Sequence, residues 1–227
     1  MKDYLSYRDT VLRGTIVSHM GSTIDSLLLH GAGKATRQRG RPIADMLESL
    51  GHGSYAFDFV GHGETGGDLE GTTLRMRHEQ AEAALSVLNG RCAVVGFSMG
   101  GEIAIRIGVQ HKFPVILLFY PAIYAAEAYD QPFGSAFSET IRKEGSWMSS
   151  DAFQLLSQYE GRVGIVIGSD DKIIPKGVVS ELTRSATSAE TIVVERVPKG
   201  SHLLMNDLIE RPEAMARIGR ILDLVVS

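Results

Sequence analysis

The chain has 227 residues, enough for one domain with a substantial core, and its hydrophobic share of 44% is ordinary for a globular protein. A net charge of −4 without a basic run argues against nucleic acid as the main partner. No apolar stretch is long enough for a membrane span, the N-terminus lacks a signal peptide's apolar segment, and the single cysteine excludes an internal disulfide, so we expect a cytoplasmic protein.

In chain order, short apolar runs alternate with segments of helical periodicity. This alternation predicts an α/β fold with a mostly parallel central sheet and helices on both faces, in a single domain over residues 1–227. The opening segment 10–20 suggests one or two short strands. Further strands are expected at 26–30, 55–59, 92–95, 115–119, 163–167 and 191–197, and helices at 35–50, 72–88, after residue 98, at 176–185 and from 212 onward.

The most informative stretch is a possible nucleophile elbow. A buried strand, Cys92 to Val95, enters a G-x-S-x-G pattern formed by Gly96, Ser98 and Gly100, and a helical pattern follows. Glycines are needed on both sides of the serine because a Cβ there would collide with neighbouring backbone. The turn would lift the Ser98 hydroxyl out of the sheet and leave the Met99 amide free at a helix N-terminus, where it can stabilise an oxyanion.

A serine nucleophile needs a base, and the base needs an acid that fixes its tautomer. In open α/β sheets such groups lie at the carboxyl ends of strands. The last two predicted strands are followed by Asp170-Asp171 and by His202, respectively. The order Ser98, Asp171, His202 is the order of an α/β-hydrolase triad.

On these motifs, nearly the whole chain resembles the α/β-hydrolase superfamily. The segment His30-Gly31-Ala32-Gly33 is similar to the family's HGxG oxyanion segment, which implies the Ala32 amide as a second oxyanion donor beside Met99. The segment Asp58 to Gly63 matches the family's D-x-x-G-H-G turn, which is structural there.

The resemblance also indicates which aspartate is the acid of the triad and where a cap is inserted. Gly168-x-x-Asp171, followed by Ile174-Pro175, matches the family's acid loop and favours Asp171 over Asp170. The segment 121–161, where the alternation lapses, falls where the family inserts its cap. We therefore expect a short cap-like insertion there. Its aromatic and apolar residues, within 120–153, should either line or cover an acyl pocket that prefers medium acyl chains or aryl groups over charged substrates, or pack the insertion onto the core.

We expect a serine hydrolase that cleaves a small-molecule carboxylic ester or thioester through an acyl-enzyme, with no metal or organic cofactor. Gly61-x-Gly63-x-x-Gly66 has dinucleotide-fingerprint spacing, but further glycines prolong the loop and no helix opens there to bind a pyrophosphate. The same triad would also serve an acyltransferase, an amidase or a carbon–carbon bond hydrolase. A non-catalytic ligand-binding homologue is a further alternative.

Overall fold

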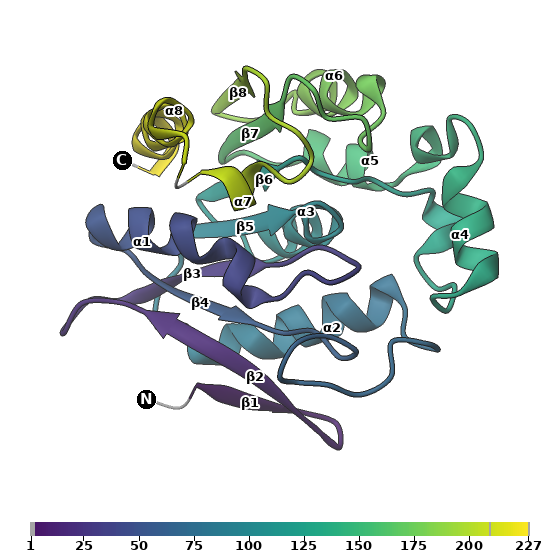
Figure 1. Ribbon diagram of the computed structural model, residues 1–227, viewed down its shortest axis with the longest axis horizontal. Helices are drawn as coiled ribbons and strands as arrows, with labels where there is room; N and C mark the ends of the chain where they lie inside the picture. The colour runs from purple at the N-terminus through teal and green to yellow at the C-terminus, as the bar shows by residue number, and fades with distance from the viewer. Residues whose placement is uncertain (1–2, 209, 227) are drawn as a thin grey trace.

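The computed structural model describes residues 3–208 and 210–226, and its centre is one eight-stranded sheet in the order β1-β2-β4-β3-β5-β6-β7-β8 (Figure 1). β2 runs antiparallel to β1 and β4, whereas the pairs from β4 to β8 are parallel. The strands are β1 (Tyr4–Tyr7), β2 (Thr10–Val17), β3 (Ile24–Leu29), β4 (Gly53–Phe57), β5 (Ala93–Phe97), β6 (Val115–Phe119), β7 (Arg162–Gly168) and β8 (Thr191–Val197).

Helices cover both faces of this sheet, as predicted. On one face α1 contacts α8, and α8 packs on β7 and β8; on the other, α2, α3, α5 and α6 contact one another in succession. Figure 1 shows α1 and α8 side by side. The helices are α1 (Arg41–Ser49), α2 (Leu74–Ala84), α3 (Gly100–Gln110), α4 (Ser135–Arg142), α5 (Ala152–Ser157), α6 (Lys176–Ser185), α7 (Leu204–Asp207) and α8 (Pro212–Val226), with 3₁₀ turns η1 (Arg37–Gly40), η2 (Leu85–Val87), η3 (Ala126–Ala128) and η4 (Ser146–Ser149).

The core lies along the central strands. Every residue of β3, β4, β5 and β6 is buried, as expected for parallel strands that are covered on both faces. The chain passes from β3 outward to β4 and then returns past β3 to β5. The carboxyl ends of β3 and β5 therefore meet where the direction of strand order reverses, which is the usual ligand position in open α/β sheets.

Two elements differ from the sequence-based expectation. The predicted helix 35–50 is a 3₁₀ turn followed by α1, since Pro42 lies in the first helical turn and the Arg37 amide donates to Asp58 instead of to a helical carbonyl. The strand β1 was not predicted, because it has only four residues and its buried positions, Leu5 and Tyr7, are too few to show a period.

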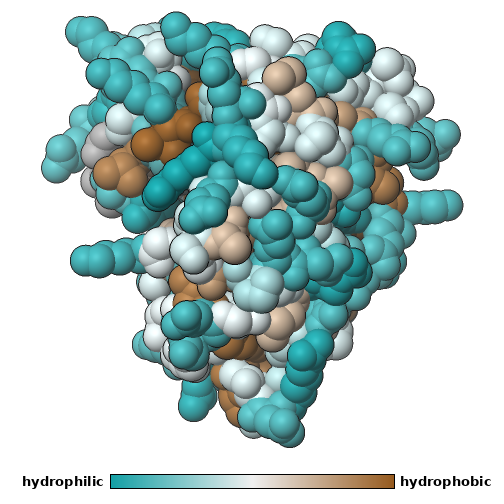
Figure 2. Space-filling model, turned by 90° about the vertical axis from the view of Figure 1, so that its right-hand side faces the viewer, coloured by the Kyte–Doolittle hydropathy of each residue, from teal (hydrophilic) through white to brown (hydrophobic). Residues whose placement is uncertain are grey.

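The surface at the carboxyl ends of the parallel strands is mostly hydrophilic, with scattered apolar residues (Figure 2). Two of the most exposed large apolar side chains of the chain are Met148 and Ile173. In the part of the chain that the structure describes, no helix is both long enough and apolar enough to cross a membrane.

The turn after β4 is held by a fully buried carboxylate. Asp58 accepts hydrogen bonds from the amides of Arg37 (2.7 Å) and Glu64 (3.0 Å) and from the Arg37 guanidinium. A Cβ at Gly63, whose φ is +46°, would lie 2.2 Å from an Asp58 oxygen. This network gives the D-x-x-G-H-G segment a structural role, as the resemblance implied.

We expect Asp58→Ala to lower the free energy of unfolding by roughly 3 kcal/mol, because it leaves buried donors without an acceptor. Urea denaturation would measure this loss. Asp45→Ala is the matched control, because it removes an exposed carboxylate paired with Arg41 and should cost about 0–1 kcal/mol. Equal losses in the two variants would contradict the role of Asp58.

Candidate active site

Ser98 lies on a strained turn between β5 and α3. Its φ is +51°, a value that non-glycine residues rarely adopt. A Cβ at Gly96 would lie 2.4 Å from the Gly100 carbonyl oxygen, and a Cβ at Gly100 would lie 2.1 Å from the Leu29 carbonyl oxygen. The backbone contacts are therefore those predicted for the elbow, and only glycine fits at both positions.

The structure brings Ser98, His202 and Asp171 together from the ends of three strands. His202 Nε2 lies 3.1 Å from Ser98 Oγ, and His202 Nδ1 lies 2.9 Å from Asp171 Oδ2. A carboxylate can only accept, so the Nδ1 proton donates to Asp171 and leaves Nε2 as the acceptor for the serine hydroxyl. This is the arrangement that a general base needs.

The carboxylate of Asp171 is almost fully buried and is held in ionised form. Burial alone would raise the pKa of Asp171, yet the hydrogen bonds from His202 and from the amides of Ile174 and Ile173 outweigh it and lower the pKa below its usual value. The neighbouring Asp170 is exposed and accepts a hydrogen bond from the Ser169 hydroxyl. Asp171, and not Asp170, is thus the carboxylate that contacts His202.

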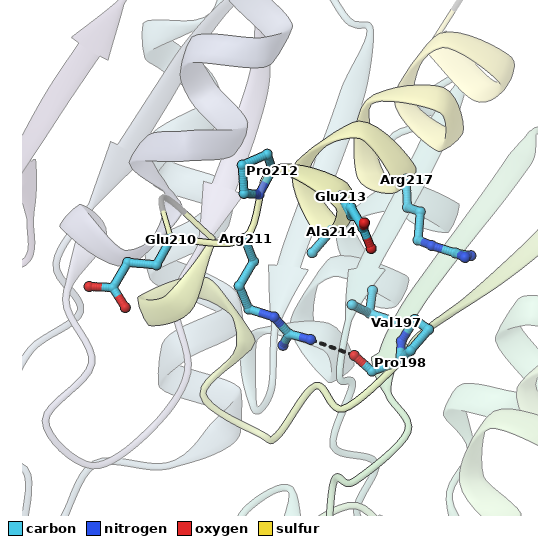
Figure 3. A pocket seen from close by; sticks show the side chains of 8 residues that line it. All are labelled: Val197, Pro198, Glu210, Arg211, Pro212, Glu213, Ala214 and Arg217. Carbon is cyan, nitrogen blue, oxygen red and sulfur yellow. Dashed lines mark hydrogen bonds between the residues drawn. The ribbon is translucent and has the colours of Figure 1, made fainter.

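Arg211 stabilises the loop that carries His202 through hydrogen bonds to its backbone. The Arg211 guanidinium donates to the carbonyl group of Pro198 (Figure 3). It also donates to the carbonyl group of Lys199. These contacts lie beside an open depression of about 480 Å³, whose eight lining residues include no serine, cysteine or histidine. The Arg211 contacts therefore stabilise the backbone of the loop that leads to His202.

The two proposed oxyanion donors lie at the ends of β3 and β5. In the described part of the chain, neither the Ala32 amide nor the Met99 amide donates a hydrogen bond. A Cβ at Gly31 would come within 3.0 Å of the Ser98 Cβ, so the segment after β3 packs directly against the elbow. Met99 is the residue that precedes α3, where the helix dipole favours negative charge.

A buried network that was not predicted supports this segment. His30 Nε2 accepts from the Phe59 amide (3.1 Å), so Nδ1 carries the proton and donates to the Gly31 carbonyl (2.7 Å). Burial, followed by the charge of Arg77, holds the pKa of His30 well below its usual value. Arg77 is itself buried and donates to the same Gly31 carbonyl (3.2 Å). No sequence signal marks Arg77, because it lies on a helix face without a motif.

A cavity of about 220 Å³ opens beside Ser98 and His202. Of the stretch 120–153, Tyr120 is the one residue among those that line it. Phe133, Phe137 and Phe153 are buried instead, and the first two pack edge to face. These three phenylalanines therefore pack the insertion onto the core, which was the alternative expectation for this stretch. Its lining residues are Gly31, Ala32, Lys34, Ala35, Arg39, Phe97, Ser98, Tyr120, His202 and Leu203.

One group of side chains has the composition of a metal site. Ligand atoms of Asp25, His52 and Cys92 lie within 4.8 Å of one another, the only such group of three among the described residues. His52 Nδ1 is hydrogen-bonded to Asp25 (2.9 Å), and burial, followed by the charge of Asp25, raises the pKa of the Cys92 thiol to about 11. All three residues lie at the amino ends of their strands, opposite Ser98. Cys92 is thus a protonated thiol that packs in the core.

Comparison with known proteins agrees with this architecture. Residues 27–158 match the model of the alpha/beta hydrolase family. None of the curated proteins compared with the chain by sequence matches it significantly.

Solved structures extend the similarity of fold over nearly the whole chain. An esterase from Pyrococcus furiosus is 22% identical, with a TM-score of 0.71 and coverage of 99% of this chain and 92% of that one. Est1E from Butyrivibrio proteoclasticus with bound ferulic acid is 14% identical, with a TM-score of 0.73 and coverage of 95% and 96%. A monoacylglycerol lipase from Paleococcus ferrophilus is 19% identical, with a TM-score of 0.69 and coverage of 95% and 98%. Together with the match of more than half of the sequence, these findings show that the chain belongs to the alpha/beta hydrolase family.

Proposed function

We propose that this protein is a serine hydrolase that cleaves carboxylic esters or thioesters through an acyl-enzyme. The observation that carries the proposal is the continuous hydrogen-bonded chain Asp171–His202–Ser98 at the carboxyl edge of the sheet. Esterases and a lipase among the proteins of similar fold support the same class of substrate.

In the proposed mechanism His202 takes the proton from Ser98 as the hydroxyl attacks the carbonyl carbon. The amides of Ala32 and Met99 stabilise the oxyanion of the tetrahedral intermediate, since both are free to donate. Protonated His202 then gives its proton to the leaving group. Water attacks the acyl-enzyme with His202 as base again, and Asp171 stabilises the imidazolium in both steps.

We further propose that residues 121–161 form a cap-like insertion within this single domain. The segment contains η3, α4, η4 and α5 between β6 and β7. Asp151 binds the Arg106 guanidinium of α3, which ties the insertion to the helix that follows the nucleophile. The insertion is short, which leaves the cavity beside Ser98 to be shaped mainly by the segment 31–39 and by the ends of the strands.

Labelling with a fluorophosphonate probe tests the proposed function. We expect the wild-type protein to react at Ser98 and to hydrolyse members of a panel of p-nitrophenyl esters and acyl-thioesters of increasing chain length. A protein that neither reacts with the probe nor hydrolyses any member of the panel would contradict the proposal.

A further inference from the structure

The cavity beside Ser98 has an excess of positive charge. Lys34 and Arg39 both line it, and no aspartate or glutamate is among its lining residues. Both cations come from the segment that follows β3 and so lie on the side of the proposed oxyanion donor Ala32. A neutral ester needs no such cations, whereas an anionic one would be attracted by them.

Arg39 differs from the two arginines nearest to it in sequence. Arg37 is paired with Asp58 and Glu64, and Arg41 is paired with Asp45. The Arg39 side chain is only partly exposed and has no ion pair with a described residue, but it interacts with the Tyr120 hydroxyl. Of these three arginines, only Arg39 lines the cavity that contains Ser98.

Tyr120 supplies a second polar group in the same wall. Its side chain is 1% exposed, and its hydroxyl is buried without a hydrogen-bond partner. A buried hydroxyl is normally paired, and the group that interacts with this one is the Arg39 guanidinium, which lines the same cavity. The Arg39 charge partly offsets the rise in the pKa of Tyr120 that burial causes, which is consistent with a guanidinium close to the hydroxyl.

The backbone at Tyr120 is also strained in a way that orients this side chain. Its φ is +40°, a value that bulky residues rarely adopt, and strain of this kind is concentrated at functional sites. The ring packs edge-on against His202, with ring centroids 4.9 Å apart. The strained turn thus holds the tyrosine ring against the proposed base, in a residue that lines the cavity.

We propose that Arg39 and the Tyr120 hydroxyl form an anion subsite that binds a carboxylate of the ester substrate, with Lys34 adding positive charge. The substrate class would then be small carboxylate-bearing esters, such as monoesters of short dicarboxylic acids, instead of the neutral esters expected from the sequence. A cavity of about 220 Å³ suits a short acyl group. The inference rests on the proposed function and specifies its substrate.

The test compares two esters that share a leaving group and a five-carbon acyl chain, mono-p-nitrophenyl glutarate and p-nitrophenyl valerate. We expect Arg39→Gln to lower kcat/KM for the glutarate ester roughly 10- to 100-fold, mostly through a higher KM. This is the usual contribution of a hydrogen bond to a charged group to binding. Activity on the valerate ester should change less than about twofold. Tyr120→Phe should show the same selectivity with a smaller loss, and Arg39→Lys should retain part of the preference.

Arg41→Gln is the matched control, because it removes an exposed arginine two residues away that does not line the cavity, and both activities should persist. A second measurement uses binding alone: glutarate should raise the melting temperature of Ser98→Ala but not that of the Ser98→Ala/Arg39→Gln double variant. The subsite would be overturned if Arg39→Gln lowered activity equally on both esters or on neither, and if Arg39 also had no effect on the rise in melting temperature that glutarate causes. If Ser98 still reacts with the fluorophosphonate in that case, the proposed hydrolase function stands without the subsite.

Discussion

Ser98→Ala should lower kcat/KM for any ester substrate by ~10⁴-fold or more, because it removes the atom that forms the acyl-enzyme. The fold should persist, because the change deletes one partly exposed hydroxyl whose only side-chain partner among the described residues is His202. Steady-state kinetics with p-nitrophenyl esters, together with circular dichroism to confirm the fold, would measure the effect. Turnover near the wild-type rate would refute the proposed mechanism.

A double variant provides the control for this prediction. His202→Ala should be about as damaging as Ser98→Ala, and the two changes together should cost little more than either one alone, because the residues act as a unit. Losses that multiply in the double variant would mean that the two side chains contribute independently. A largely active His202→Ala protein would show that another group is the base.

Asp171→Asn should reduce activity by several orders of magnitude, whereas Asp170→Asn should stay within about tenfold of wild type. The amide NH₂ group of an asparagine would donate to His202 Nδ1 and so favour the tautomer with its proton on Nε2, where it blocks acceptance from Ser98. Asp170 does not contact His202, so its replacement leaves the tautomer unchanged. Kinetics of both variants on the same ester would test this ranking.

The comparison requires that both variants be folded, because Asp171 also accepts from the amides of Ile173 and Ile174. An asparagine keeps one carbonyl oxygen for these amides, which is why the amide replacement separates catalysis from loop stability better than alanine does. The reverse ranking on folded protein would assign the acid role to Asp170.

The order of strands and helices was predictable because each central element carries its own local signal. A continuous apolar run marks a strand that is buried on both faces, and β5, β6 and the second half of β3 are such runs. The short edge strand β1 lacks that signal, since only alternate residues are buried and the period repeats twice at most. The division of the helix 35–50 was missed for another reason: the Arg37 amide is drawn out of helical bonding by Asp58, 21 residues away.

The sequence by itself determined the elbow and the residues that follow the strands, because these depend on a few neighbouring residues. The glycines around Ser98 are dictated by backbone contacts within one turn, and the carboxyl ends of parallel strands meet at one edge in any sheet of this kind. Only the tertiary structure decided that Asp171 contacts His202, that Arg77 donates to the Gly31 carbonyl, and that Arg39 and Tyr120 line the cavity together. Those contacts join residues that are far apart in the chain or on helix faces without a motif, so their geometry arises only when the strands and helices pack.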